Sequence, residues 1–404
     1  MNGHYSGTPV MKIVIAPDSF KESLSALEVA QHMEKGFKEI LPDADFILLP
    51  IADGGEGTVD TMIAATAGTK HWKHVTGPLG QPVTGFYGLS GDGNTAFIEM
   101  AAASGLALVK NEHRNPLLTT SQGTGELILA ALDKGVHKLI IGIGGSATND
   151  GGAGMLHALG VRLLDGNGNQ IMPGGRGLGM LEKIDDAGID PRIANCNIQV
   201  ACDVDNPLIG PRGASAVFGP QKGATPEMVD ELDSNLETFG RLLEQHTGNR
   251  IIDKPGAGAA GGMGAALSGL LNAELRPGVE IVLEAVNLDK AIAGADLVIT
   301  GEGKLDSQTA GGKAPAGVAK AAARHNVPVI GIGGSLGTDL VMESMTGFSA
   351  MFAAVSRNCT LAVAIEEAEH NLLRAARNIA AVVQLGMQIQ ASGGRTQESR
   401  KRPL

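Results

Sequence analysis

The sequence contains few aromatic residues, with one Trp, two Tyr and nine Phe among 404 residues. Proteins that bind single-stranded nucleic acid stack the bases on aromatic side chains, so this scarcity argues against that class. The formal net charge of −11 points the same way, because nucleic acids and anionic membranes attract basic surfaces. We therefore expect a protein that binds neither nucleic acid nor a membrane.

Cysteine and long apolar runs are scarce as well. The three cysteines are odd in number and lie in apolar or mixed surroundings, which predicts reduced thiols and not a disulfide framework or a zinc site. No apolar run approaches the roughly 18 residues that a membrane-spanning helix needs. The first ten residues lack the basic and apolar segments of a signal peptide, so we expect a cytoplasmic protein.

Glycine and short apolar segments are abundant, with 58 Gly and 43% hydrophobic residues. Short apolar runs alternate with amphipathic stretches, which predicts an α/β fold with largely parallel sheets. The expected strands cover residues 12–16, 46–51, 138–143, 198–202, 296–300, 327–332 and 349–355. The expected helices cover residues 25–39, 58–66, 123–134, 151–159, 225–246, 312–324 and 361–385.

The length suits two domains. Residues 75–98 combine Gly and Pro with alternating apolar positions, which is typical of antiparallel hairpins and marks a boundary. We expect one discontinuous α/β domain from residues 11–75 and 285–390, and an inserted α/β domain from residues 76–284. The polar ends, residues 1–10 and 391–404, are expected to be disordered.

Three glycine-rich segments are candidates for binding phosphate, because backbone amides without a nearby Cβ can approach phosphate oxygens closely. The segment 139–154 follows an apolar run, 255–267 has the pattern G-x-G-x-x-G, and 299–314 adds lysines and acids. Their candidate cofactor-binding residues are Gly144, Gly145, Ser146, Gly256, Gly258, Gly261, Glu302 and Lys313. Each turn could also be purely structural.

The first of these segments has a second interpretation. Gly142, Gly144 and Ala147 follow an expected strand, and Asp165 comes about 20 residues later, as in a dinucleotide-binding fingerprint. Residues 148–152 intervene before the helix and lengthen the turn, and Asp150 would repel a pyrophosphate. An NAD-dependent dehydrogenase of a small hydroxy acid is therefore kept as the alternative.

Charged residues follow several expected strands directly. Asp18, Ser19 and Lys21 come after the first strand, and Lys21 suits a carboxylate or a phosphate. Asp53 and Glu56 lie in a glycine-rich loop and suit Mg²⁺, although helix capping is the competing interpretation. Asp203 and Lys222 occupy two further loops of this kind. Ligands of open α/β sheets bind outside the carboxyl ends of strands, so we expect such loops to converge.

Several catalytic motifs are missing from the sequence. Neither the phosphate-binding loop G-x-x-x-x-G-K-[ST] nor the nucleophile elbow G-x-S-x-G occurs, and the ten His show no metal-ligand spacing. Glycines, lysines and carboxylates together match phosphoryl transfer best. A small-molecule binding protein without activity is the non-enzymatic alternative.

The segments PDSFKESLSA, ADGGEGT, GTGEL, GIGGSATNDGGAG, ACDVDNPL, FGPQKGA, GAGAAGGMGAAL and TGEGKLDSQT occur in this order between Met11 and Gly386. In this order they resemble the bacterial glycerate kinases of the first type; the one small departure is Glu22, where that family often has Gly. The resemblance implies transfer of phosphate from ATP to (R)-glycerate with Mg²⁺, giving 2-phosphoglycerate in glyoxylate or galactarate/glucarate metabolism. It also implies two α/β domains around a cleft, one flavodoxin-like and one restriction-enzyme-like.

On this interpretation the partners are glycerate and ATP, and the chain is a monomer or a homodimer. Candidate catalytic residues are Lys21, Asp203, Lys222 and Asp306. Asp18, Ser19 and Lys21 are candidates for binding substrate, and Asp53 and Glu56 for binding the metal. The sequence does not decide which carboxylate acts as the base.

Overall fold

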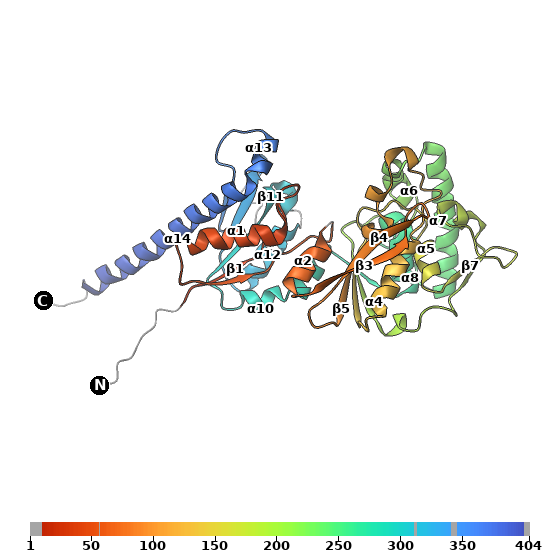
Figure 1. Cartoon of the computed structure of the whole chain (residues 1–404), viewed down its shortest axis with the longest axis horizontal. Coiled ribbons are helices and arrows are strands. Elements are labelled where there is room, and N and C mark those ends of the chain that lie inside the picture. The colour runs from red at the N-terminus through yellow and green to blue at the C-terminus, as the bar shows by residue number, and fades with distance from the viewer. Residues whose placement is uncertain (1–9, 56, 311–312, 341–345, 400–404) are drawn as a thin grey trace. The chain divides into compact units, whose positions relative to one another are not determined.

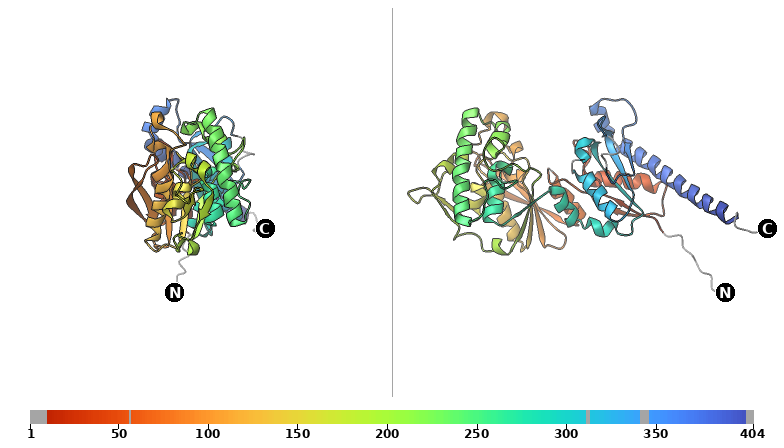
Figure 2. Two further views of the ribbon diagram at one scale, coloured as in Figure 1. Left: turned by 90° about the vertical axis from the view of Figure 1, so that its right-hand side faces the viewer. Right: turned by 180° about the vertical axis from the view of Figure 1, so that it is seen from behind.

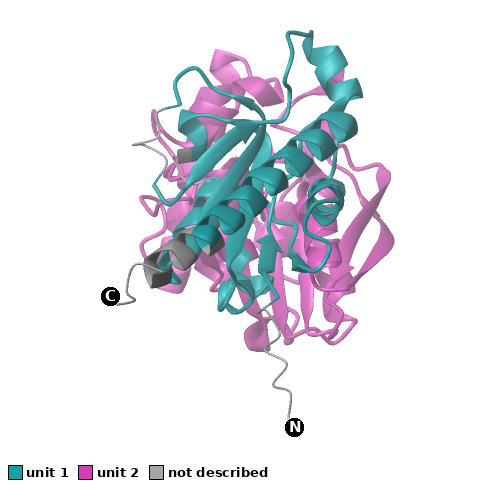
Figure 3. Cartoon of the chain, turned by 90° about the vertical axis from the view of Figure 1, so that its left-hand side faces the viewer, with its two compact units in different colours: residues 1–52, 283–404 teal, residues 53–282 magenta. Residues whose placement is uncertain are grey.

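A computed structural model of the chain describes residues 10–55, 57–310, 313–340 and 346–399. The chain forms two compact units, coloured separately in Figure 3. Unit 1 consists of Met1–Ala52 and Leu283–Leu404, and unit 2 of Asp53–Val282. The expected boundary near residue 75 is therefore wrong. Residues 53–75 belong to unit 2 because β3 (Thr69–Thr76) pairs with β4 (Pro82–Leu89) along its whole length.

Unit 1 is built on five parallel strands in the order β13-β12-β11-β1-β2. If the strands of unit 1 are numbered 1 to 5 along the chain and read from β2 to β13, the order is 2-1-3-4-5. This is a doubly wound arrangement whose switch point lies between β1 and β11. Its strands are β1 (Lys12–Ile15), β2 (Asp45–Leu48), β11 (Leu297–Leu305), β12 (Val329–Leu336) and β13 (Ala350–Ala353). Its helices are α1 (Ala26–Lys38), α10 (Leu288–Ile292), α11 (Ser307–Ala310), α12 (Ala314–Arg324), α13 (Leu361–Glu366) and α14 (Ala368–Ser399).

The alternation of side chains along these strands decides how the helices cover the sheet. In β1, Ile13 and Ile15 face a core to which α1 contributes Met33 and Phe37. The helix α1 starts at a capping box, in which Ser25 and Glu28 bond reciprocally to backbone and side chain. The helix α14 lies beside α1 in Figures 1 and 2 and covers the same core.

The C-terminal helix is longer than the sequence suggests. Disorder was expected from residue 391, but α14 continues to Ser399, because no proline interrupts it and extending an existing helix is easy. Residues 385–390 of this helix are all exposed. The expected disordered extension at residues 1–10 falls, apart from exposed Val10, outside the described residues.

Unit 2 is built on six strands in the order β10-β9-β6-β5-β4-β3. The hairpins expected at residues 75–98 are confirmed, because β3, β4 and β5 pair antiparallel, whereas β5, β6, β9 and β10 are parallel. The other strands of this sheet are β5 (Thr95–Glu99), β6 (Lys138–Gly142), β9 (Asn197–Ala201) and β10 (Glu274–Arg276). A separate antiparallel pair is formed by β7 (Arg162–Leu164) and β8 (Lys183–Asp185). With unit 1, this confirms an α/β protein with largely parallel sheets.

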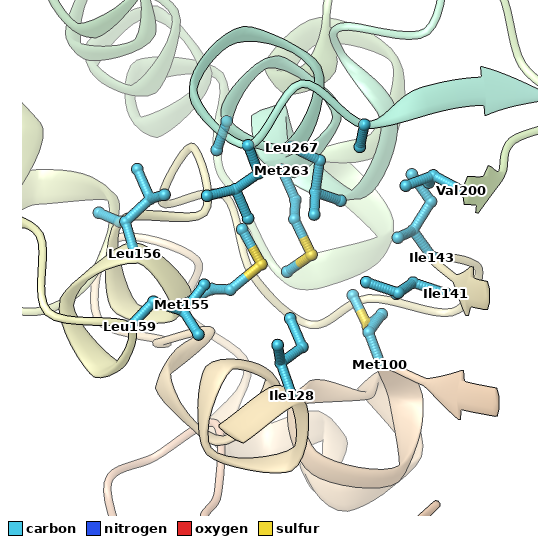
Figure 4. Packing of buried hydrophobic residues seen from close by; sticks show 14 of the residues in the cluster. Met100, Ile128, Ile141, Ile143, Met155, Leu156, Leu159, Val200, Met263 and Leu267 are labelled. Atoms are coloured by element: carbon cyan, nitrogen blue, oxygen red, sulfur yellow. The ribbon is translucent and has the colours of Figure 1, made fainter. Parts of the chain in front are cut away.

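The α-helices of unit 2 are α2 (Thr58–Ala65), α3 (Ala101–Ser104), α4 (Gln122–Leu132), α5 (Ala153–Ala158), α6 (Ala214–Phe218), α7 (Pro226–Thr247), α8 (Ala259–Leu270) and the start of α9 (Gly278–Ala285). Short 3₁₀ turns are η1 (Leu106–Leu108), η2 (Asn111–His113), η3 (Gly175–Met180), η4 (Ile193–Asn195) and η5 (Pro220–Lys222). Figure 4 shows the core, where Ile141 and Val200 of the sheet meet Ile128, Met155 and Met263 of α4, α5 and α8. This packing fixes the ends of β6 and β9, which carry the candidate site. In the described part of the chain, no helix is both long and apolar enough to cross a membrane.

Candidate functional site

A cavity of about 290 Å³ lies in unit 2 where β6 and β9 end. Loops that follow the two strands form two of its walls, and the segment before α2 forms a third. Parallel strands bring their carboxyl ends to one edge of a sheet, which is why these distant loops meet there. The lining comprises Asp53, Gly54, Gly55, Ile143, Gly144, Gly145, Ser146, Ala201, Cys202, Asp203, Val204, Phe218, Gln221, Lys222, Ala259 and Ala260.

The glycines that follow β6 leave space for a ligand. A Cβ added to Gly144 would meet no atom within 4 Å, and one added to Gly145 would meet only the Cβ of Ala101 at 3.6 Å. Gly145 also has φ +71°, a conformation that glycine adopts without strain. This open stretch of backbone fits the close approach of a phosphate group, and the binding of a cofactor by Gly144, Gly145 and Ser146 stays a prediction.

Lys222 supplies a positive charge at this cavity, although its side chain is only 2% exposed. Its ammonium group donates to Ser146 Oγ at 2.7 Å and to the carbonyl oxygen of Thr148 at 2.6 Å. Burial lowers the pKa of Lys222 to about 7, against the opposing effect of the nearby Asp150 carboxylate. The lysine is therefore a poorly hydrated cation that an anionic ligand would stabilise.

Asp150 explains how the long turn after β6 is held. It is fully buried and accepts from the backbone N and Oγ of Ser121 and from the backbone N of Gly152 and Gly154. Burial raises the pKa of Asp150, while these hydrogen bonds oppose the rise. Asp150 thus anchors the turn and the start of α5 and does not face the cavity, a role that its position before a helix could have suggested.

Two carboxylates line the same cavity. Asp203 Oδ1 accepts from the backbone N of Gly278 at 2.9 Å, and Asp53 Oδ1 accepts from the backbone N of Gly55 at 3.0 Å. Burial, opposed by the Gly278 bond and assisted by the charge of Asp53, raises the pKa of Asp203. A bound cation would relieve this repulsion, so the donor set fits Mg²⁺.

The described residues contain no group of three or more His, Cys, Asp or Glu that could hold a metal. An ion at Asp53 and Asp203 would therefore complete its shell with water and substrate oxygens, as Mg²⁺ commonly does. Glu56, the other predicted metal ligand, lies outside the described residues.

The predicted residues of unit 1 gather near β1 and β11. The backbone N of Asp18 donates to Gly301 O at 2.8 Å, and Asp18 Oδ1 accepts from the backbone N of Ser19 at 2.6 Å. Lys21 is exposed, and its backbone N would lie 3.6 Å from a Cβ added to Gly303. These loops flank the switch point of the sheet, a usual place for ligands.

Glu302 and Lys313 form an ion pair, with Lys313 Nζ 3.7 Å from Glu302 Oε2. Thr309 Oγ1 donates to Glu302 Oε1 at 2.5 Å. Asp306 Oδ1 accepts from the backbone N of Gln308 at 3.0 Å, as an N-cap of α11 does. Burial, which raises the pKa of Asp306, is outweighed by hydrogen bonds from Lys304 and Gln308, so the pKa is lowered. This geometry suits a structural cap better than a general base.

The pattern G-x-G-x-x-G at residues 256–261 does not form a phosphate loop. A Cβ on Gly258 would lie 2.2 Å from Pro207 O, and one on Gly261 would lie 2.0 Å from Thr148 O. A Cβ on Gly256 would meet Leu275 and Cys202 at 3.0 and 3.1 Å. These glycines allow backbones to pack closely and do not line the cavity, although the adjacent Ala259 and Ala260 do.

Most of the chain is similar to known proteins. Residues 13–384 match the glycerate kinase family. The chain belongs to the glycerate kinase family. It is 58% identical to glycerate 2-kinase of Escherichia coli K12 over 93% of this chain and 99% of that protein. Its identity to glycerate kinase of Bacillus subtilis 168 is 57%, over 93% of this chain and 98% of the relative.

A crystal structure assigned to glycerate kinase 2 of Salmonella typhimurium LT2 has the same fold as this family member. The TM-score is 0.88 at 58% identity, covering 94% of this chain and 100% of that one. The dehydrogenase alternative gains no support. The helix after Gly144 starts only at Ala153, and Asp165 accepts from the backbone N of Asn167 and Asn169 in an exposed turn, where it caps its own loop.

Proposed function

We propose that this glycerate kinase family member transfers the γ-phosphoryl group of ATP to the 2-hydroxyl of (R)-glycerate with Mg²⁺, forming 2-phosphoglycerate. One observation carries the proposal: a single cavity combines open glycine backbone at Gly144 and Gly145, a buried lysine, and two neighbouring carboxylates. Phosphoryl transfer depends on positioning and on neutralising charge, and these groups supply both. The names of two relatives, glycerate 2-kinase and glycerate kinase, support glycerate as the acceptor.

The roles follow from chemistry. Lys222 binds a phosphoryl oxygen through its ammonium group, and the backbone around Gly144 and Gly145 accommodates the phosphate chain. Asp53 and Asp203 hold Mg²⁺, which when bound neutralises phosphate charge. Asp203, whose pKa is raised by burial, is the group that we assign to accept the proton of the substrate hydroxyl.

In unit 1, Lys21 with Asp18 and Ser19 forms a second anion-binding group near the switch point. We assign it to the substrate carboxylate or a phosphate, and Glu302 with Lys313 to the nucleotide. The reaction is proposed for the cytoplasm.

The test is ADP formation followed by a coupled assay, with glycerate present and absent and with Mg²⁺ present or chelated. We expect ADP to form only when glycerate, ATP and Mg²⁺ are all present. Hydride transfer with NAD and no turnover of ATP would overturn the proposal.

A further inference from the structure

The helix α2, which follows the Asp53 loop, has no capping side chain of its own. Its N-cap is Gly57 in a left-handed conformation, φ 85°, without a side-chain hydrogen bond. The backbone N of Val59 instead donates to Oε1 of Glu99 at 2.8 Å, across 40 residues of sequence. The first amides of a helix lack intrahelical acceptors and carry partial positive charge, so a carboxylate from the sheet suits this position.

The Asp53 loop is bonded to the same helical turn. Thr58 Oγ1 donates to Gly55 O at 2.7 Å, and the backbone N of Gly55 donates to Asp53 Oδ1 at 3.0 Å. Three consecutive hydrogen bonds and two short stretches of backbone therefore lead from Glu99 to the Asp53 carboxylate. A displacement at the start of α2 would be transmitted to Asp53.

The ends of β6 and β9, which lie in the same sheet as the end of β5 that carries Glu99, pack against the Asp53 loop. Glu99 is in register with Gly142 of β6, and a Cβ on Gly142 would lie 3.0 Å from Gly54 O. On the other side, a Cβ on Gly54 would lie 2.9 Å from the Cβ of Ala201. The Asp53 loop therefore has little room to move. Glu99 is only 8% exposed and fixes where the following helix, α2, starts.

We propose that Glu99 is a positioning residue, which holds the start of α2 and thereby places the Asp53 carboxylate at the cavity for a divalent cation. Burying a carboxylate costs free energy that an apolar side chain would not, which is reasonable where a defined hydrogen bond is required. The proposal rests on the proposed function only for the assignment of Asp53 to the cation.

The experiment compares Glu99→Ala, Glu99→Gln and Glu126→Ala. Glu126 is the matched control, because it also accepts a hydrogen bond from a backbone N, that of Thr76 at 2.6 Å. Neither Glu126 nor Thr76 lines the cavity. Three quantities are measured on the full chain: amide exchange of residues 57–61, the dissociation constant of Mn²⁺ alone from water-proton relaxation, and the Mg²⁺ activation constant with glycerate and ATP.

We expect Glu99→Ala to accelerate exchange at Val59 and to weaken Mn²⁺ binding and Mg²⁺ activation about tenfold, as loss of an outer-shell partner commonly does. Glu99→Gln keeps an acceptor oxygen and should recover most of the loss, and Glu126→Ala should change none of the three. Equal metal constants in Glu99→Ala and Glu126→Ala would overturn the proposal, even if Glu99→Ala melts earlier. If the wild-type chain forms no ADP with glycerate, the proposed function fails, while exchange and Mn²⁺ binding still decide the role of Glu99.

Discussion

At the scale of single residues, Lys222 has the most unusual environment in the described site. A cation with a pKa of about 7 changes its charge close to neutral pH, unlike an ordinary lysine, whose pKa is 10.5. If the ammonium form binds phosphate, kcat/KM should fall as pH rises through about 7, because the free enzyme loses the proton there.

The measurement is kcat/KM against pH for the wild type and Lys222→Arg. The guanidinium stays protonated over this range, so the fall at high pH should disappear or move upward in any active Arg variant. A wild-type profile that is flat from pH about 6 to about 9 would contradict a role for the ammonium form.

Lys21 offers a second residue-scale prediction. It is exposed beside β11, and an anionic contact there should be worth roughly 2–4 kcal/mol of transition-state stabilisation, about 30- to 1,000-fold in kcat/KM. Lys21→Ala should therefore lose activity with little change in melting temperature.

Lys38→Ala is the control for Lys21, since Lys38 is an exposed lysine of unit 1 whose Nζ lies 2.7 Å from Oε1 of Glu34 and 5.6 Å from the centre of the Phe46 ring. Such surface pairs contribute little to stability. If Lys21→Ala and Lys38→Ala have the same kinetics, Lys21 is a solvated loop residue.

At the scale of elements, the contact of α1 with α14 depends on Gly36. A Cβ at this position would lie 2.7 Å from the Cβ of Ala376 and 2.7 Å from Leu373 O. Gly36→Ala should therefore lower the free energy of unfolding by about 1–3 kcal/mol, because the two helices must move apart. Urea or thermal unfolding measures it.

Gly386→Ala is the same substitution at an open position of α14, where a Cβ would meet nothing within 4 Å. It should raise the free energy of unfolding by up to about 1 kcal/mol through helix propensity alone. Equal effects of the two substitutions would show that the close approach at Gly36 is not tight in solution.

The sequence predicted elements better than their roles. All seven expected strands and the hairpins at residues 75–98 are present, because apolar β-branched runs bounded by Gly and Pro give a strong local signal. The pattern at Gly256–Gly261 misled, since glycines that admit a neighbouring backbone and glycines that admit phosphate look the same in sequence. Only the last turns of α14, residues 386–399, were unexpected, because they follow the end of the apolar periodicity that predicted a helix over 361–385.

At the scale of the whole molecule, the sequence could indicate which loops follow strands but not which of them meet. Gly144 and Asp203 meet at one cavity because β6 and β9 are neighbours, a fact of strand order, and Lys222 reaches the same cavity from η5. The burial of Lys222 and the capping by Glu99 also come from tertiary contacts 74 and 40 residues apart. No local sequence pattern predicts the burial of Lys222 or the capping by Glu99.

The ends of the chain give a prediction at this scale. Removing residues 1–10 and 393–404 should leave activity and melting temperature near wild type, because residues 385–390, before the C-terminal cut, are already exposed. Ending the chain at residue 371 should instead unfold unit 1, since Leu372 and Ala376 are completely buried. A drop of several degrees after the short truncation would mean that an end packs on the fold.

The central claim, phosphorylation of glycerate at its 2-hydroxyl, is tested most directly by proton-coupled phosphorus NMR of the product. Purified protein is incubated with (R)-glycerate, ATP and Mg²⁺, with a sample lacking glycerate as the control. A phosphate on the carbon that bears a single hydrogen gives a doublet, and a phosphate on the terminal CH₂ gives a triplet. We predict a new doublet that requires glycerate; a triplet would contradict the position of transfer, and no new phosphate ester would contradict the central claim.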